Sequence, residues 1–258
     1  YGLPLEERTL AAALREAGYT TAICGKWHLG HFQPAYLPTR RGFDHQYGHY
    51  NGAIDYFTHE RDGGFDWHRD DQVCRDEGYS TTLVGREAAR LMFRRASEDP
   101  RPHQVPEAYK APYAHLPEPR RTYAGMVAAE DEAIGAIVAA VEAAGRRGNT
   151  LFVFSSDNGG PMPGKVTSNG PLRAGKGTLY EGGVRVCALA TWEGHIKAGS
   201  VVNAPLHMVD WYPTLLRLAG AKLECFPVRH GSPCSWCGGA GGGASESDRD
   251  QHRRSGVW

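Results

Sequence analysis

The chain has 258 residues, of which 41% are hydrophobic, and this is enough for one α/β domain with a substantial core. Lys plus Arg and Asp plus Glu number 29 each, so the overall charge does not favour nucleic acid or an acidic membrane surface as a partner. No apolar run has the length of a transmembrane helix, and the scattered cysteines define no disulfide framework.

A helix and a strand are predicted at the start of the chain. Residues 5–17 carry apolar side chains at helical spacing, and Gly18 ends the helix. A β-rich run over 19–24 then leads into Gly25-Lys26-Trp27-His28-Leu29-Gly30. In extended chain Lys26 and His28 would share a face and could bind an oxyanion together. The alternative is a surface lysine and a packed histidine.

Residues 34–79 are rich in Gly, aromatic residues, His and Asp, and they have little periodicity. This pattern is typical of a long ordered loop region that lines a pocket over a rigid scaffold. Four histidines here lack the regular spacing of metal ligands, and we interpret them as polar groups of the loops: His45, His49, His59 and His68.

Two helices and a strand are predicted in the middle of the chain. The helices cover 85–95 and 122–144, and the segment 96–119 between them is rich in proline and charge and is expected to be extended. The continuous apolar run 151–154 predicts a strand buried on both faces of a parallel sheet.

The strongest candidate site follows that strand, at Ser155-Ser156-Asp157-Asn158-Gly159-Gly160. Ligands collect at the carboxyl ends of strands in open α/β sheets. Asp157 and Asn158 offer a carboxylate beside an amide oxygen, which suits Ca²⁺ or Mg²⁺. The alternative is a simple Asp-Asn-Gly-Gly turn. Lys176 follows in a Gly- and Lys-rich loop and can reach the same site, although a lone lysine is usually solvated.

The rest of the chain divides into a folded part and a tail. A strand over 186–191 and a helix over 207–220 complete the predicted elements. From residue 223 the sequence is rich in glycine and poor in apolar periodicity, which predicts disorder or a sequence unrelated to the preceding domain. The expected organisation is therefore a domain over 1–222 and an atypical tail over 223–258.

Three motifs together resemble the sulfatase family, and within it the arylsulfatase B group. They agree with the family in order and spacing across roughly residues 1 to 222. The segments 18–30 and 155–160 are similar to the family's second signature and to its metal-binding strand end. The segment 171–185, Pro-Leu-Arg-Ala-Gly-Lys-Gly-Thr-Leu-Tyr-Glu-Gly-Gly-Val-Arg, resembles the lysine loop that follows.

This resemblance implies an alkaline-phosphatase-like α/β sandwich, with a central mostly parallel sheet flanked by helices, incomplete in this chain. It implies a sulfuric ester hydrolase that uses Ca²⁺ and a cysteine-derived formylglycine. Asp157 and Asn158 would be metal ligands, and Lys26 and Lys176 would bind the sulfate. His28 would steer the nucleophile or the breakdown of the covalent intermediate.

The chain departs from the family pattern in two places. The family has two further aspartate ligands and a Cys- or Ser-x-Pro-Ser-Arg nucleophile segment before the first motif, and neither precedes Gly18. We therefore expect an N-terminally truncated domain that is inactive alone. Cys225-Phe-Pro-Val-Arg229 has the minimal nucleophile spacing, which we interpret as coincidence. Over 94–109 an expected apolar strand is missing, and His103 is the only candidate for the family's sulfate-contacting histidine.

Two other functions remain open at this point. One is a non-catalytic pseudoenzyme that keeps an anion-binding pocket. The other is a phosphatase or phosphodiesterase of the same superfold, with two transition metals and a Ser or Thr nucleophile. The expected partner is a small sulfate ester or a sulfated glycan, with no nucleic acid and no membrane span. Family resemblance alone suggests a secretory or lysosomal location, and no Asn-x-Ser/Thr acceptor supports it.

Overall fold

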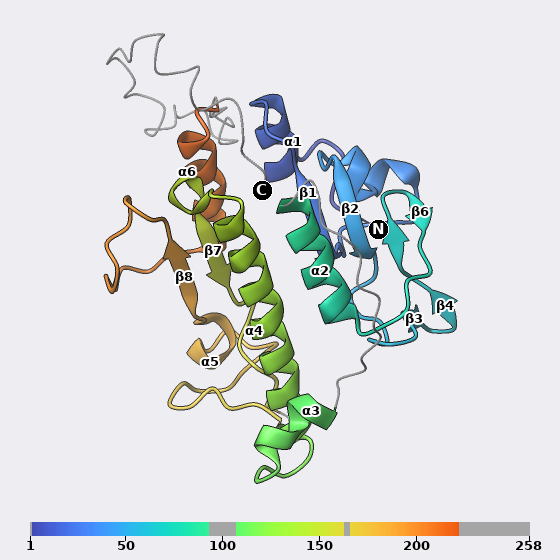
Figure 1. The fold of residues 1–258 in the computed structure, drawn as a ribbon, viewed down its shortest axis with the longest axis vertical. Coiled ribbons are helices and arrows are strands. Elements are labelled where there is room, and N and C mark those ends of the chain that lie inside the picture. The colour runs from blue at the N-terminus through green and yellow to red at the C-terminus, as the bar shows by residue number, and fades with distance from the viewer. Residues whose placement is uncertain (1, 93–106, 163–165, 222–258) are drawn as a thin grey trace. The chain divides into compact units, whose positions relative to one another are not determined.

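The computed structural model describes residues 2–92, 107–162 and 166–221 (Figure 1). These residues form two units, each described by itself. The first takes the described residues of 2–54, 60–75 and 202–221, and the second takes those of 55–59 and 76–201. Within the described ranges, no helix combines the length and the apolar character that crossing a membrane requires.

A mixed four-stranded sheet forms the centre of the first unit, in the order β1-β2-β5-β6. β1 and β2 run parallel, with Ala22 opposite His45 and Lys26 opposite His49. A long crossover permits this parallel pairing, whereas the tight turn between β5 and β6 requires an antiparallel one. The strands of the unit are β1 (Ala22–Lys26), β2 (His45–His49), β3 (Glu60–Arg61), β4 (Gly64–Phe65), β5 (His68–Arg69) and β6 (Gln72–Val73).

The prediction of a loop region over 34–79 is wrong in this unit. The region contains β2 to β6 and two 3-10 helices, Pro34–Tyr36 and Pro38–Arg40. Periodicity failed to indicate them because the buried positions of β2 hold Gln46, Tyr47 and Gly48 rather than aliphatic residues. The remaining strands are two residues long, which is too short for an alternating pattern.

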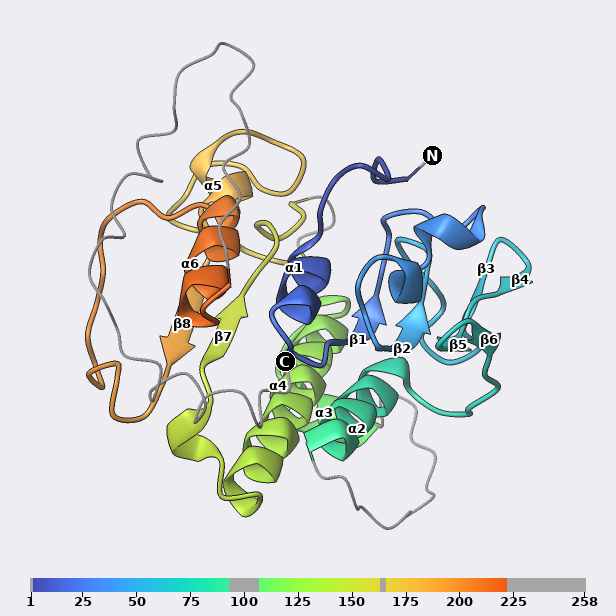
Figure 2. The same cartoon turned by 90° about the horizontal axis from the view of Figure 1, so that it is seen from above.

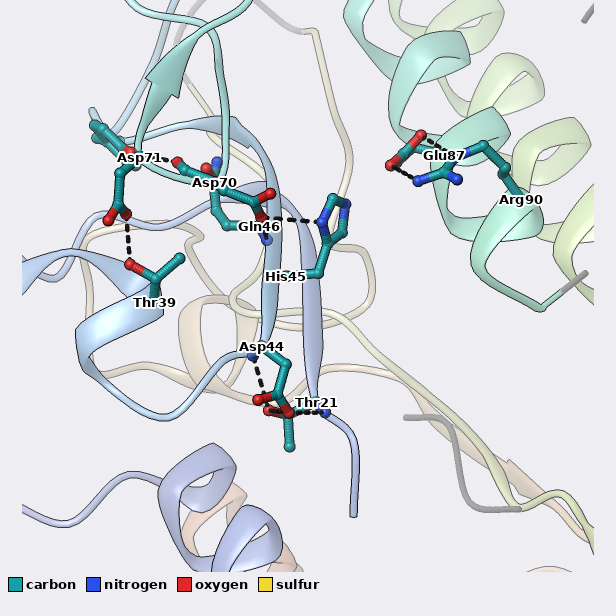
Figure 3. Close-up of polar contacts among 10 residues, drawn as sticks. Thr21, Thr39, Asp44, His45, Gln46, Asp70, Asp71, Glu87 and Arg90 are labelled. Carbon is teal, nitrogen blue, oxygen red and sulfur yellow. Dashed lines mark hydrogen bonds and ion pairs between the residues drawn. The ribbon is translucent and has the colours of Figure 1, made fainter. Parts of the chain in front are cut away.

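A carboxylate joins the amino ends of the two parallel strands. The Thr21 amide donates to Asp44 Oδ2 at 3.0 Å, just before β1 and β2 begin (Figure 3). Arg15, in helix α1 (Leu10–Glu16), pairs with the other oxygen of Asp44 at 2.9 Å. These contacts fix the start of both strands and connect them to the helix that precedes β1.

Helices α1 (Leu10–Glu16) and α6 (Trp211–Leu218) form the apolar cluster of the first unit. Ala13, Leu14 and Leu216 are buried in it. α1 begins later than the predicted residue 5 because the Thr9 hydroxyl accepts from the Ala12 amide at 3.0 Å, which caps the helix. A short 3-10 helix, Met208–Asp210, precedes α6.

Helices α2 (Ser80–Met92) and α4 (Arg120–Ala143) pack side by side in the second unit (Figures 1 and 2). The long predicted helix 122–144 is confirmed, and α2 begins five residues before its predicted start. The described part of 96–119 is helical rather than extended, with α3 (Glu107–Lys110) followed by a 3-10 helix, Ala111–Tyr113. Glu107 in the first turn of α3 and Lys110 in its last match the helix dipole.

Strand β7 (Phe152–Ser155) pairs antiparallel with β8 (Ala188–Thr191), and within the described residues β8 is its only partner strand. A 3-10 helix, Arg147–Asn149, precedes β7, and α5 (Glu181–Val184) precedes β8. The expectation of a parallel strand buried on both faces is wrong here, since Val153 and Phe154 are 39% and 38% exposed. A two-stranded sheet does not bury both faces of a strand.

The contact between α2 and α4 is tested by Gly85→Ala. A Cβ at Gly85 would lie 2.6 Å from Ala133 Cβ, so the helices must separate. Overpacking of this kind costs about 1–3 kcal/mol, which outweighs the gain in helix propensity of roughly 1 kcal/mol. We expect urea unfolding to show a net loss of stability.

Gly135→Ala, in α4, is the matched control because a Cβ there meets no atom within 4 Å. It should stabilise the protein by roughly 1 kcal/mol. If both variants are stabilised equally, α2 and α4 do not pack closely at Gly85.

Candidate functional site

The end of β7 presents two oxygen ligands. Asp157 is exposed, and its carboxylate faces solvent. Asn158 is half-buried, and its Nδ2 donates to the Gly159 carbonyl at 3.0 Å, which leaves the amide oxygen as the group that can coordinate. The Ser156 hydroxyl donates to the Asn158 carbonyl at 3.0 Å and closes the turn.

These two residues fit a hard cation in the kind of donor they offer. A carboxylate and an amide oxygen are ligands that Ca²⁺ and Mg²⁺ prefer, but Ca²⁺ takes about six to eight oxygens. In the part of the chain that the structure describes, no group of three or more His, Cys, Asp and Glu residues could hold a metal ion. The pair alone could therefore supply only part of a coordination shell.

The lysine loop, residues 171–185, lies directly against this turn. The Lys176 amide donates to the Gly160 carbonyl at 3.2 Å. Asn169 joins the two segments, because its Oδ1 accepts from the Gly160 amide and its Nδ2 donates to the Gly160 carbonyl, both at 2.9 Å. A third bond from Nδ2 reaches the Ala174 carbonyl at 3.0 Å. The backbone of Lys176 is thus fixed beside the Asp157–Asn158 turn.

Glycines make this close approach possible. A Cβ at Gly159 would lie 1.8 Å from the Gly182 carbonyl oxygen, and one at Gly175 would lie 2.3 Å from the Gly160 carbonyl oxygen. Neither position can hold a side chain without moving the backbone opposite. The Gly159 amide also donates to the Gly183 carbonyl at 3.0 Å.

Lys26 and His28 lie at the carboxyl end of β1 in the first unit, and both are exposed. Lys26 is the last residue of β1. The expected extended chain does not continue to His28, whose φ is 54°. Its amide donates to the Tyr50 carbonyl at 2.9 Å, and this bond turns the chain. The argument that Lys26 and His28 share a face of extended chain is therefore wrong.

The predicted site residues divide between the units. Lys26 and His28 belong to the first unit, and Asp157, Asn158 and Lys176 belong to the second. Within the second unit the structure brings Asp157 and Asn158 together with the lysine loop. His103 lies outside the described residues.

Asp66 is a buried charge that the sequence did not indicate. Its side chain accepts hydrogen bonds from the Tyr50 amide at 3.0 Å and from the Asn51 amide at 2.8 Å. The Asn51 side chain donates a third bond at 2.8 Å, and His68 Nδ1 lies 3.3 Å away. Burial alone would raise the pKa of Asp66, but the bonds from His68, Tyr50 and Asn51 outweigh it and hold the pKa well below its usual range.

The fold and the strand-end site agree with one family of hydrolases. The sequence matches the family model described as Sulfatase over residues 2–221, and the chain belongs to the sulfatase family. It is 35% identical to arylsulfatase J of Mus musculus over 245 residues, which cover 86% of this chain and 40% of that protein. It is 34% identical to N-acetylgalactosamine-6-sulfatase of Homo sapiens over 240 residues, 85% of this chain and 46% of that protein.

Solved structures give the same result for the fold. The structure of Ps i-CgsB in complex with k-i-k-neocarrahexaose has a TM-score of 0.79 and 33% identity, covering 87% of this chain and 56% of that one. The PsFucS1 sulfatase from Pseudoalteromonas sp. has a TM-score of 0.65 and 28% identity, covering 85% and 52%. The predicted α/β class with an alkaline-phosphatase-like fold is confirmed, and so is the sulfatase resemblance. The chain spans about half the length of the curated relatives it matches.

The role of Asn169 is tested by Asn169→Ala. The substitution removes the hydrogen bonds of Asn169 to Gly160, Ala174 and Met162 and leaves the Gly160 amide without its side-chain acceptor, which should cost about 1–3 kcal/mol. We expect faster hydrogen exchange at the Lys176 amide. Ser168→Ala is the control, since that exposed hydroxyl accepts only a long 3.4 Å bond from Gly170. Equal protection of Lys176 in both variants would contradict the assignment.

Asp66 should also make stability depend on acid pH. Its pKa is depressed in the folded state, so its contribution is fully present above the ordinary aspartate value of 3.8 and is lost as the pH falls toward the folded pKa. Denaturant unfolding should show a constant gap between wild type and Asp66→Asn from pH 7 to about 5, and this gap should shrink below about pH 4. A gap that stays constant through this acid range would contradict the shift.

Proposed function

We propose that the protein to which this chain belongs hydrolyses sulfate esters. The observation that carries the proposal is the fixed approach of the lysine loop to the β7 turn, which places the backbone of Lys176 against the Asp157–Asn158 pair. A divalent cation and an ammonium group that face one anion are the electrostatic arrangement that sulfate transfer needs. Family membership supports the same reaction class.

Each candidate residue has a role in this proposal. Asp157 and Asn158 would hold a Ca²⁺ ion, which would supply positive charge to a sulfate oxygen and to a formylglycine nucleophile. Lys26 and Lys176 would bind the sulfate oxygens and stabilise the negative charge that grows on them. His28 would orient the nucleophile or move its proton. His103 remains a proposed sulfate contact.

The substrate class is proposed as a sulfated glycan. The human relative is an N-acetylgalactosamine-6-sulfatase, and the Ps i-CgsB structure contains k-i-k-neocarrahexaose. Both are similar to this chain over more than four fifths of its length. The printed sequence contains no Cys- or Ser-x-Pro-Ser-Arg segment, so we propose that the 258-residue chain alone has no turnover.

The two alternative functions are a phosphatase or phosphodiesterase and a non-catalytic pseudoenzyme. A phosphatase of the same superfold would need two clusters of Asp and His ligands, and none with three or more such residues exists within the described ranges. A pseudoenzyme would show the same lysines and oxygen ligands as a sulfatase. Binding measurements on the chain therefore test the anion site, and turnover tests the chemistry.

The anion site is tested by Lys26→Ala and Lys176→Ala. Calorimetric titration with sulfate in the presence of Ca²⁺ should show each variant binding about tenfold more weakly than wild type, or roughly 1.4 kcal/mol. The reason is that each substitution removes a cation that faces the anion. Lys197→Ala, another exposed lysine of the second unit, should bind sulfate as wild type does.

Three results would contradict the proposal. One is equal binding by all three lysine variants, and another is tighter binding of Zn²⁺ with phosphate than of Ca²⁺ with sulfate. Turnover of an aryl sulfate by the wild-type chain above the Lys26→Ala background would contradict the proposed inactivity of the chain alone.

A further inference from the structure

The position of the His28 ring depends on one short loop. The tyrosine loop, Tyr50–Gly52, follows β2 directly. Its first carbonyl accepts the His28 amide at 2.9 Å, and this holds His28 at a φ of 54°, a conformation that side-chain-bearing residues rarely adopt. A Cβ at Gly52 would lie 2.6 Å from His28 Cε1, so the imidazole packs against this glycine. Movement of the loop therefore moves the imidazole.

Asp66 holds the tyrosine loop by its backbone. Only 5% of Asp66 is exposed, yet both of its oxygens are engaged. Oδ1 accepts from the Tyr50 amide, and Oδ2 accepts from both the amide and the side chain of Asn51. Charged acceptors make stronger bonds than neutral ones, and losing such a buried partner leaves the amide donors unsatisfied.

The Tyr50 side chain has contacts of its own, separate from the backbone bonds to Asp66. Its ring stacks on the His68 ring, with centroids 4.1 Å apart and an interplanar angle of 18°. Its hydroxyl donates to the Asp70 carbonyl at 2.9 Å. These contacts fix the tyrosine side chain but do not hold the backbone amides of Tyr50 and Asn51. Asp66 is the group that binds both of these amides.

We propose that Asp66 is a positioning residue for His28, acting through the tyrosine loop. This inference rests on the proposed role of His28 at the sulfate site. It explains why a charged residue is buried between Phe65 and Trp67, where an apolar residue would be expected. The carboxylate maintains a backbone conformation that presents the imidazole, and it does not itself contact the substrate.

The test compares Asp66→Asn with Asp44→Asn in the same unit. Asn at position 66 keeps one acceptor and turns an NH₂ group toward the donors that the carboxylate bound. Asp44 also accepts a backbone amide bond, but at the amino ends of β1 and β2, where the Thr21 amide and hydroxyl donate to it. Its bonds do not involve the tyrosine loop. Both variants should lower the melting temperature, so stability alone does not distinguish them.

The deciding readout is the Cε1–H resonance of His28 in the NMR spectrum, assigned by its loss in His28→Ala. We expect Asp66→Asn to displace this resonance and to reduce its sulfate-induced shift at least threefold. Asp44→Asn should leave both unchanged. An unchanged His28 resonance and sulfate response in Asp66→Asn, or an equal displacement in Asp44→Asn, would overturn the proposal.

Two further outcomes are also informative. If sulfate moves no wild-type resonance but Asp66→Asn still displaces that of His28, the positioning role stands and the proposed function fails. If Asp66→Asn does not fold, Asn51→Ala is measured instead, since it removes only the side-chain bond to Asp66. It should displace the His28 resonance in part, and an undisplaced resonance would overturn the inference.

Discussion

The backbone-to-backbone contact between the β7 turn and the lysine loop is the constraint on which the second unit's candidate site depends. At Gly159 the neighbouring carbonyl lies where a Cβ would stand, and at Gly175 the distance is nearly as short. No side chain separates the two segments, so their hydrogen bonds can be direct. The residues with chemistry, Asp157, Asn158 and Lys176, therefore flank glycines. Their side chains do not join the two segments, because glycines and Asn169 provide that contact.

In the first unit, carboxylates rather than glycines hold neighbouring backbone segments together. Asp44 joins the amino ends of β1 and β2, and Asp66 holds the loop after β2. A parallel pair gives adjacent carboxyl ends, but the pairing alone does not fix the loops that leave those ends. The left-handed conformation of His28 costs conformational free energy of order 1–3 kcal/mol, which surrounding contacts must offset. The bond to the Tyr50 carbonyl, itself held by Asp66, is such a contact.

The sequence predicted elements whose information is local. Helix α4 has a long apolar stripe, β1 and β7 are short β-rich runs, and the glycine-flanked Asp-Asn pair follows its strand. The residues that position these groups could not be predicted from the sequence. Asp66 bonds to residues 15 and 16 positions earlier in the chain, and Asn169 bonds to residues up to 9 positions away. Neither separation matches the repeat of a helix or a strand. The strands of 34–79 were missed for a related reason. The burial of β2 comes from aromatic packing, such as Tyr47 against Trp67 with ring centroids 5.2 Å apart, and the other strands are only two residues long.

The composition of the metal-ligand pair bears on the choice between sulfate and phosphate under the proposed function. A sulfate monoester carries one negative charge, whereas a phosphate monoester carries close to two near neutral pH. An amide ligand at Asn158 leaves more of a cation's charge uncompensated than a second carboxylate would, so the cation retains attraction for a weakly charged substrate. Lys176 of the same unit would add positive charge without the need for a second metal. One amide, one carboxylate and Lys176 would therefore leave enough positive charge to hold a singly charged sulfate ester with a single metal ion.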